Sequence, residues 1–474
     1  MLPNNVTDDP TQPTDVRDRR WFRYLAVTMQ AIAIIVTWQL WSVRETPPNL
    51  PLFGLPAVSV GWALLASLVL VLVRPLWGVA LHSVLLAVAI VTDQMRLQPE
   101  MLSLTVLLWG TLPMSSSLFL CRAHLIALWW YAGFQKLLSP NYFSVVGGEF
   151  IEKAPPFTGY TIGVPLAIFV VVIEMALAVM LLFRKTRKPA VVMALLLHLG
   201  ILTTLISLHW NWAVWPWNVA VACASIAFFW NWEPSAWQSF SASPRLVRLA
   251  AVFLLISPLA FYGGWVNGYL AYCLYTENTP RAWTAPATTI EPSDATLLSG
   301  ETELNEVSFG SMAVPFPPSD RLYMRYFQQV AKPGTRMVIV YPQFWWDDRT
   351  ERRVRLIEMK QELWIAEGNV RDGKATGYWE YFFPNGNREE AGTFKNGQRH
   401  GVWKLWHDNG KLAAQGSYRE GREHGIWTSW SRAGIKELEG EFDSGMMHGS
   451  WTQWYANGRE IKATYRSGTL VDKR

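Results

Sequence analysis

The sequence has few cysteines and few charged residues. Of its 474 residues only three are cysteine, and none of them lies in a CxxC pair. They are Cys121, Cys223 and Cys273. We therefore expect neither a disulfide framework nor a metal site. Charged residues make up 17% of the chain and hydrophobic residues 50%. This balance is typical of an integral membrane protein with a polar tail.

The sequence also lacks a run of basic residues and a cleavable signal peptide. Its net charge of +5 is spread along the chain, which gives no reason to expect a nucleic-acid partner. The first twenty residues carry four aspartates and do not follow the basic-then-apolar plan of a signal peptide. The first apolar stretch is therefore predicted to be a retained signal anchor that follows a cytoplasmic tail, residues 1–22.

Long apolar runs are abundant before residue 275. Runs that are long enough to cross a bilayer, or nearly so, fall at about 23–43, 52–73, 75–92, 101–120, 123–138, 160–183, 189–208, 211–230 and 246–271. They predict a polytopic α-helical membrane domain over residues 23–275 with about nine transmembrane helices and the lipid bilayer as its partner.

Basic residues in the loops predict the orientation of this domain. Arg19, Arg20 and Arg23 lie at the start of the first run, and Arg245 and Arg248 lie at the start of the ninth. The basic residues of 184–188 follow the sixth run. With nine spans all of these loops lie on the cytoplasmic side. The protein is then expected in a bacterial inner membrane, with an extracytoplasmic tail.

The first part of the tail, residues 276–365, has proline and glycine breaks and short apolar runs. The run Met337–Tyr341 indicates a strand. We expect a small extracytoplasmic α+β segment, and we find no catalytic motif in it.

Residues 366–474 repeat with a period of 24 residues. Trp379, Trp403, Trp427 and Trp451 keep this spacing and each follows a glycine by two positions. Three further glycine sets, which begin at Gly368, Gly373 and Gly386, keep the same period. Each unit is predicted to be two short strands with aromatic residues on one face and glycine turns between them. The pattern resembles MORN-type repeats, which implies an all-β sheet with the four tryptophans as its core.

His400, His424 and His448 also recur with this period. Neighbouring repeats lie about 10 Å apart, because each contributes two strands at about 4.8 Å. Shared metal ligation needs bonds of about 2 Å. The histidines are therefore expected to serve structure or surface recognition.

Within the membrane domain, Lys136 lies in the apolar, tryptophan-rich segment Trp129–Leu138. On a helix, Trp129, Ala132, Gly133 and Lys136 share one face, so the lysine stands at the end of a groove of small residues. Such a groove admits another helix or a flat ligand. Because Lys136 lies near the outer end of its helix, it can alternatively snorkel to the interface.

Three further ionisable residues are expected near the midplane. Glu174 and His198 lie about 15 Å below the outer surface by the helical rise, and His82 reaches a similar depth. Such residues usually face a partner or a watery cavity. One interpretation is a proton path or a quinone-type pocket that opens toward Lys136 and His209. The other is a Glu174–His198 hydrogen bond that fixes helix packing.

Several short segments resemble the membrane domain of the vitamin K-dependent γ-carboxylase family and its bacterial HTTM relatives. They are Thr92–Pro99, Ala132–Leu137, Ser139–Phe143, Val172–Leu177, His198–Gly200 and Tyr269–Tyr275. A small DoxX-like membrane protein shares the Gly-x-x-Lys-Leu feature. The carboxylase resemblance implies that Lys136 is the base that deprotonates a reduced, vitamin K-like quinone. The large lumenal carboxylase region has no counterpart here.

Two functions follow as alternatives. The first is an enzyme that acts on a lipophilic quinol, with Lys136 as base and with Glu174 and His198 handling protons. Its substrate-binding residues are expected to be Ala132, Gly133, His82, His209, Asp93 and Arg96, although Asp93 and Arg96 can also simply pair with each other. The second is a non-catalytic membrane scaffold whose repeats bind a protein or an envelope component.

Overall fold

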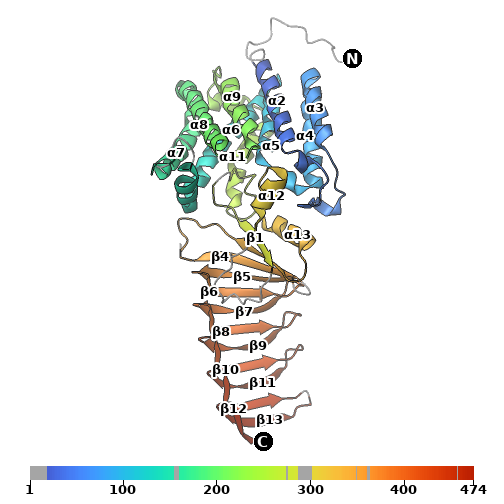
Figure 1. The fold of residues 1–474 in the computed structure, drawn as a ribbon, viewed down its shortest axis with the longest axis vertical. Coiled ribbons are helices and arrows are strands. Elements are labelled where there is room, and N and C mark those ends of the chain that lie inside the picture. The colour runs from blue at the N-terminus through green and yellow to red at the C-terminus, as the bar shows by residue number, and fades with distance from the viewer. Residues whose placement is uncertain are drawn as a thin grey trace. The chain divides into compact units, whose positions relative to one another are not determined.

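The helices and strands of this chain fall into two units (Figure 1). The computed structural model describes residues 19–153, 158, 160–273, 276–286, 302–348, 350–359, 363–455 and 457–474. The helical unit comprises Met1–Thr279 and Asn305–Tyr326, and the sheet unit comprises Pro280–Leu304 and Phe327–Arg474. Most of the predicted cytoplasmic tail and the last two residues of the predicted membrane domain lie outside the described residues.

The helical unit is built mainly from apolar helices. The helices are α2 (Arg20–Val36), α3 (Gly61–Val73), α4 (Pro75–Thr92), α5 (Pro99–Gly110), α6 (Ser115–Leu138), α7 (Gly163–Leu182), α8 (Arg187–Ser207), α9 (Val214–Phe229), α10 (Ala236–Ala242), α11 (Arg245–Ile256), α12 (Leu304–Met312) and α13 (Asp320–Val330), the last two at the border of the units. A π-helix, η4 (Tyr142–Ile151), follows α6, and short 3₁₀ turns are η1 (Trp38–Trp41), η2 (Leu52–Gly54), η3 (Gln94–Arg96), η5 (Arg184–Thr186) and η6 (Ser257–Phe261).

Three described helical segments are long and apolar enough to cross a membrane. They are Pro75–Thr92, Gly163–Leu182 and Arg184–Ser207. The apolar helices Gly61–Val73 and Val214–Phe229 are shorter. The structure therefore shows a helical region with membrane-type helices, and it does not confirm the predicted nine spans.

Proline accounts for the clearest difference from the predicted spans. The expected span 101–120 is interrupted, because α5 ends at Gly110 and α6 begins at Ser115. Pro113, between them, has no backbone N–H to donate and cannot continue a helix. As a result α6 is 24 residues long. It contains the predicted short span 123–138 together with the end of the preceding run.

All described strands belong to one antiparallel sheet of 14 strands. The strands are β1 (Arg281–Pro286), β2 (Thr302–Glu303), β3 (Thr335–Val340), β4 (Arg352–Met359), β5 (Leu363–Arg371), β6 (Lys374–Phe382), β7 (Arg388–Lys395), β8 (Gln398–Trp406), β9 (Leu412–Arg419), β10 (Arg422–Trp430), β11 (Lys436–Asp443), β12 (Met446–Trp454), β13 (Glu460–Arg466) and β14 (Thr469–Lys473). From β3 to β14 each strand pairs with the next one in the chain, which Figure 1 shows as a run of colours from orange to red.

The predicted α+β segment 276–365 does not form a unit of its own. The strand predicted around Met337–Tyr341 is present as β3, which runs from Thr335 to Val340, and β4 pairs with β5 along its whole length, from Arg352↔Val370 to Met359↔Leu363. The boundary predicted at residue 366 thus falls inside the sheet. The physical reason is that an unpaired strand edge is unfavourable, so the repeats extend onto the strands before them.

The periodic glycines serve three different purposes, whereas the sequence predicts turns only. Asp372 and Gly373 are two successive residues with positive φ, and together they form a tight hairpin turn. Each following repeat has two such residues at the equivalent positions. The set beginning with Gly386 occupies longer turns, and Gly377 and its equivalents have positive φ within strands, next to irregularities in strand register.

The remaining glycine set lies inside strands and makes room for the tryptophans. A Cβ atom added to Gly392 would lie 2.3 Å from the ring of Trp403, and the corresponding distances in the other repeats are between 2.0 and 2.2 Å. Trp403 Nε1 donates a hydrogen bond to the Thr393 carbonyl oxygen at 3.2 Å. We call the tryptophans at positions 379, 403, 427 and 451 the tryptophan ladder, and the glycines at positions 368, 392, 416 and 440 the platform glycines.

Aromatic rings of neighbouring strands complete the packing of the tryptophan ladder. The rings of Phe394 and Tyr418 contact Trp403 edge-on, with centroids 5.1 and 6.0 Å away. Phe442 contacts Trp451 in the same way, with centroids 4.9 Å apart. Edge-to-face contacts of this kind add to the free energy gained by burying the rings. The ladder tryptophans and the rings packed against them therefore share one face of the sheet, whereas Tyr378, one residue before Trp379, is exposed.

Replacing a platform glycine should loosen the sheet locally. In Gly416→Ala the new Cβ would meet the Trp427 ring, where it lies 2.0 Å from Cδ2. We expect the opening free energy of β9 and β10, measured by hydrogen exchange, to fall by about 1–3 kcal/mol. The same change in a Trp427→Val background should cost much less.

Gly310→Ala provides the control, because no atom lies within 4 Å of its added Cβ. If Gly416→Ala cost as much in the Trp427→Val background as in the wild-type background, the proposed contact between ring and glycine would be contradicted.

Candidate functional site

An ion pair between α6 and α7 forms the centre of the candidate site. Lys136 Nζ lies 2.5 and 2.7 Å from the two carboxylate oxygens of Glu174. Their side chains are only 9% and 5% exposed, and the ring of Tyr142 lies 5.8 Å from Nζ. Each charge is neutralised by the other in a layer where an unpaired charge is costly.

This pairing replaces the snorkelling alternative for Lys136. The π-helix Tyr142–Ile151 continues the chain after α6 and packs against the beginning of α7 through Tyr142, Ile151, Ala167 and Val171. The packed helices therefore continue beyond the C-terminal end of α6. The ammonium group is directed to a carboxylate between helices instead of toward solvent.

The groove beside Lys136 is filled by α7. A Cβ atom added to Gly133 would lie 2.7 Å from Met175 Cγ and 3.0 Å from the Val171 carbonyl oxygen. Ala132, beside it, is buried. Of the two occupants that a small-residue groove admits, the structure shows the neighbouring helix. The close approach brings Glu174 within reach of Lys136.

His198 binds a different pair of residues from the predicted one. Its Nε2 accepts a hydrogen bond from Trp129 Nε1 at 3.2 Å, and Nδ1 lies 2.8 Å from Asn218 Oδ1. Because Nε2 accepts, the proton is on Nδ1 and is donated to Asn218. The expected Glu174–His198 hydrogen bond is thus replaced by two separate interactions. Both interactions use side chains on one face of α6: Trp129 bonds to His198, and Lys136 pairs with Glu174.

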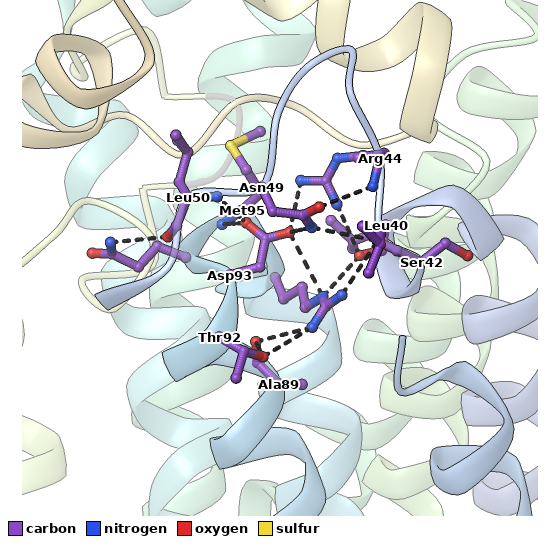
Figure 2. Close-up of polar contacts among 12 residues, drawn as sticks. Leu40, Ser42, Arg44, Asn49, Leu50, Ala89, Thr92, Asp93 and Met95 are labelled. Atoms are coloured by element: carbon purple, nitrogen blue, oxygen red, sulfur yellow. Dashed lines mark hydrogen bonds and ion pairs between the residues drawn. The ribbon is translucent and has the colours of Figure 1, made fainter. Parts of the chain in front are cut away.

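Asp93 and Arg96 belong to a separate buried cluster (Figure 2). Asp93 accepts hydrogen bonds from Asn49 Nδ2 at 2.9 Å and from the Leu50 and Met95 amides at 3.0 and 3.1 Å. Arg44 lies 2.7 Å and Arg96 3.7 Å from its carboxylate. Asp93 therefore pairs with arginines, as one alternative predicts, and does not line the mouth of a pocket.

Arg96 ties the segment before α3 to the end of α4. Its guanidinium donates hydrogen bonds to carbonyl oxygens of residues 40, 42, 58 and 89, all between 2.8 and 3.4 Å. Arg44, the second cation of the cluster, was not identified from the sequence. A single arginine in a loop gives no signal of its own, since its partner Asp93 is 49 residues away in the chain.

His82 and His209 also lie apart from the ion pair. His82 Nδ1 is 2.8 Å from Ser67 Oγ, a contact that joins α4 to α3. His209 is an exposed residue just after α8 with a φ of 50°. Of the predicted substrate-binding residues, only Ala132 and Gly133 lie beside Lys136. Among the residues that the structure describes, no group of three or more His, Cys, Asp or Glu side chains could hold a metal ion.

The sheet unit offers a second candidate site on the face opposite the tryptophan ladder. Tyr378, Val402 and Ile426, each one residue before a ladder tryptophan, point to this face because side chains alternate along a strand. They are 56%, 55% and 68% exposed. We call these three side chains the exposed row.

Paired charges border the exposed row. Arg388 lies 2.5 Å from Glu380 and stacks over Trp406 at 5.2 Å, and Lys436 lies 2.5 Å from Glu439. The hydrogen bond from Lys436 lowers the pKa of Glu439, so this carboxylate stays charged at neutral pH. The exposed row thus consists of apolar side chains on alternate strands, with Thr393 and Ser417 on the strands between them and paired charges at its border.

Two family models match parts of this chain. Methylamine utilisation protein MauE matches residues 114–256, which include α6 to α11, and the MORN repeat variant matches residues 375–396 and 399–420. No curated protein sequence matches the chain. The matches and the apolar helices indicate a membrane protein, and its C-terminal sheet is built of MORN repeats. The matched membrane family is MauE; the predicted γ-carboxylase or HTTM resemblance is not shown.

Removing one partner of the buried pair should destabilise the helical unit. Lys136→Met leaves the Glu174 carboxylate unpaired, and Glu174→Leu leaves the lysine unpaired. We expect each single change to cost about 3–5 kcal/mol, and the double change to cost clearly less than their sum. Thermal unfolding of the full chain in detergent measures both effects. Additive losses would contradict the interaction.

Proposed function

We propose that this protein is a membrane-anchored scaffold whose MORN repeats bind a protein or an envelope component. The exposed row is the observation that carries this proposal. Apolar side chains occur singly on most protein surfaces, whereas a patch repeated at equivalent positions marks an interaction site. Tyr378, Val402 and Ile426 occupy the same position in three of the four repeats, on the face that the tryptophan ladder does not use, and the fourth repeat has Ser450 there.

The architecture supports this role. Neighbouring strands satisfy the backbone of the sheet, and the tryptophan ladder supplies its packing. The opposite face is therefore available for recognition without loss of stability. The paired charges along its border supply the polar rim that is usual around a protein interface.

The orientation is part of the proposal. Basic residues before the first apolar helix and in the segment 184–188 favour a cytoplasmic N-terminus in a bacterial inner membrane. The repeats would then face the extracytoplasmic side. An envelope partner would meet the exposed row there.

Site-specific photocrosslinking tests the exposed row. A photoreactive amino acid at Val402 should crosslink one defined partner in cells, and Ile426→Asp should abolish that product, because a charge in place of an apolar contact opposes burial. The matched control is the same amino acid at Ala433, an exposed loop residue. A product that persists in Ile426→Asp, or that forms equally at Ala433, would refute binding through the row.

The Lys136–Glu174 pair supports a second candidate, a membrane enzyme that acts on a reduced quinone. A lysine, a glutamate and Tyr142 converge between helices within the part of the chain that matches MauE. In this proposal Lys136 is the base, Glu174 and His198 handle protons, and a lipophilic quinol is the substrate.

Lys136→Arg separates this chemistry from packing. Arginine keeps the positive charge beside Glu174 but stays protonated, so it cannot act as a base. If the enzyme proposal holds, oxygen consumption on a reduced naphthoquinone should be lost in Lys136→Arg while the thermal unfolding midpoint stays close to that of the wild type. Absence of turnover in the wild type would eliminate this candidate.

A further inference from the structure

Two arginines share one carboxylate just after the end of α4 (Figure 2). Arg44 Nη2 lies 2.7 Å and Arg96 Nε 3.7 Å from Oδ2 of Asp93. The Arg44 side chain is 5% exposed, and its buried Nε has no hydrogen-bond partner among the described residues. The cluster thus contains one positive charge more than it contains negative charge. An excess of buried positive charge is stabilised when an additional anion approaches it.

Two further arginines bond to the segments around this cluster. Arg321 Nη2 donates a hydrogen bond to Gln94 Oε1 at 2.5 Å, and Arg325 Nη1 donates one to the Pro51 carbonyl oxygen at 2.8 Å. Both arginines lie in the part of α13 that belongs to the helical unit. Their acceptors are uncharged, and within the described residues neither guanidinium forms an ion pair. We call Arg44, Arg96, Arg321 and Arg325 the arginine group.

The acidic residues of the same segments do not cancel the charge of the arginine group. Glu45 follows Arg44 in the chain and is exposed, and Asp320 is the first residue of α13. In the described structure neither of them forms an ion pair with the arginine group. Together with Asp93 they bring three negative charges against four positive ones. The group therefore remains a positively charged site.

The arginine group lies at the end of a helix that is able to cross a membrane. The helix α4, Pro75–Thr92, is long and apolar enough to do so. Its 18 residues extend about 27 Å, close to the hydrocarbon thickness of about 30 Å. Two residues after α4, the Gln94 amide donates a hydrogen bond to the Leu50 carbonyl oxygen at 2.9 Å. The segments that the arginine group contacts are therefore expected at the level of phospholipid headgroups.

Large apolar side chains lie close to the arginine group along the chain. Phe53, two residues after the Arg325 acceptor Pro51, is 87% exposed. Trp62, in the first turn of α3, is 76% exposed. Exposed aromatic residues at the end of a membrane helix are typical of contact with lipid. A free phosphate ion would gain nothing from these side chains, whereas the acyl chains of a phospholipid would bury them. They therefore favour a lipid as the source of the anion.

We propose that the arginine group binds the phosphate of an anionic phospholipid, with Phe53 against its acyl chains. Arginine suits this ligand, because its planar guanidinium can donate two parallel hydrogen bonds to a phosphate group. Basic residues next to a membrane helix also attract anionic headgroups. The inference needs only that α4 crosses the membrane. It does not depend on what the exposed row binds or on whether Lys136 is catalytic.

Lipid titrations of the full chain in detergent, followed by native mass spectrometry, test this site. The probes are phosphatidylglycerol and phosphatidylcholine with the same acyl chains, and the wild type should bind phosphatidylglycerol more tightly. The double variant Arg321→Gln/Arg325→Gln should bind phosphatidylglycerol about 30-fold more weakly, because each arginine near the headgroups contributes a factor of about five. Equal binding of the two lipids by the wild type, or unchanged binding by the double variant, would overturn the proposal.

The matched control removes two arginines from the sheet unit. Arg419→Gln/Arg422→Gln changes the net charge by the same amount, at two exposed residues that pair across β9 and β10. This variant should bind phosphatidylglycerol as the wild type does. Loss of binding here as large as in Arg321→Gln/Arg325→Gln would show a general effect of net charge, and it would contradict a site at the arginine group.

Two further measurements separate lipid binding from phosphate binding and from damage to the fold. Inorganic phosphate should not raise the thermal unfolding midpoint, whereas phosphatidylglycerol should. Phe53→Asp, at a side chain that is mostly exposed, should keep the wild-type midpoint without lipid and bind phosphatidylglycerol about fivefold more weakly. Stabilisation by inorganic phosphate as large as that by the lipid, or unchanged lipid binding in Phe53→Asp, would refute a phospholipid site.

Discussion

Two buried clusters of opposite charges join distant segments of the helical unit. Lys136 and Glu174 neutralise each other between α6 and α7, and Asp93 lies between Arg44 and Arg96. An unpaired charge inside a layer of apolar helices would cost several kcal/mol, so these residues are compatible with the fold only in the presence of their partners. Because the partners come from segments far apart in the chain, the same contacts join those segments.

The sheet unit is stabilised by a different interaction, the packing of each ladder tryptophan on a platform glycine of the neighbouring strand. The ring occupies the space that a side chain would take, and its N–H bonds to a backbone carbonyl oxygen. Stability therefore comes from one face of the sheet and from its backbone. The side chains of the other face do not take part in this packing. The exposed row is therefore available for recognition.

The two functional candidates differ in what they require of Lys136. A general base has to reach its substrate, whereas Lys136 Nζ lies 2.5 Å from a carboxylate oxygen of Glu174 between α6 and α7. The α7 helix also fills the groove in which a flat substrate would have to lie. These contacts favour a packing role for the pair, and for that reason the scaffold is the leading proposal. The MauE and MORN matches are compatible with either candidate, since they describe a membrane segment and a repeat sheet.

Local periodicity made part of this structure predictable. The 24-residue period identified the ladder tryptophans, and the helical period placed Trp129, Gly133 and Lys136 on one face of α6. A periodic pattern within one segment does not reveal which residues of another segment it will contact. Helix packing at Gly133 decided that Lys136 meets Glu174, and strand pairing decided that the platform glycines lie under rings and that β1 to β4 join the repeats. These outcomes depend on contacts between distant segments, which only the tertiary structure determines.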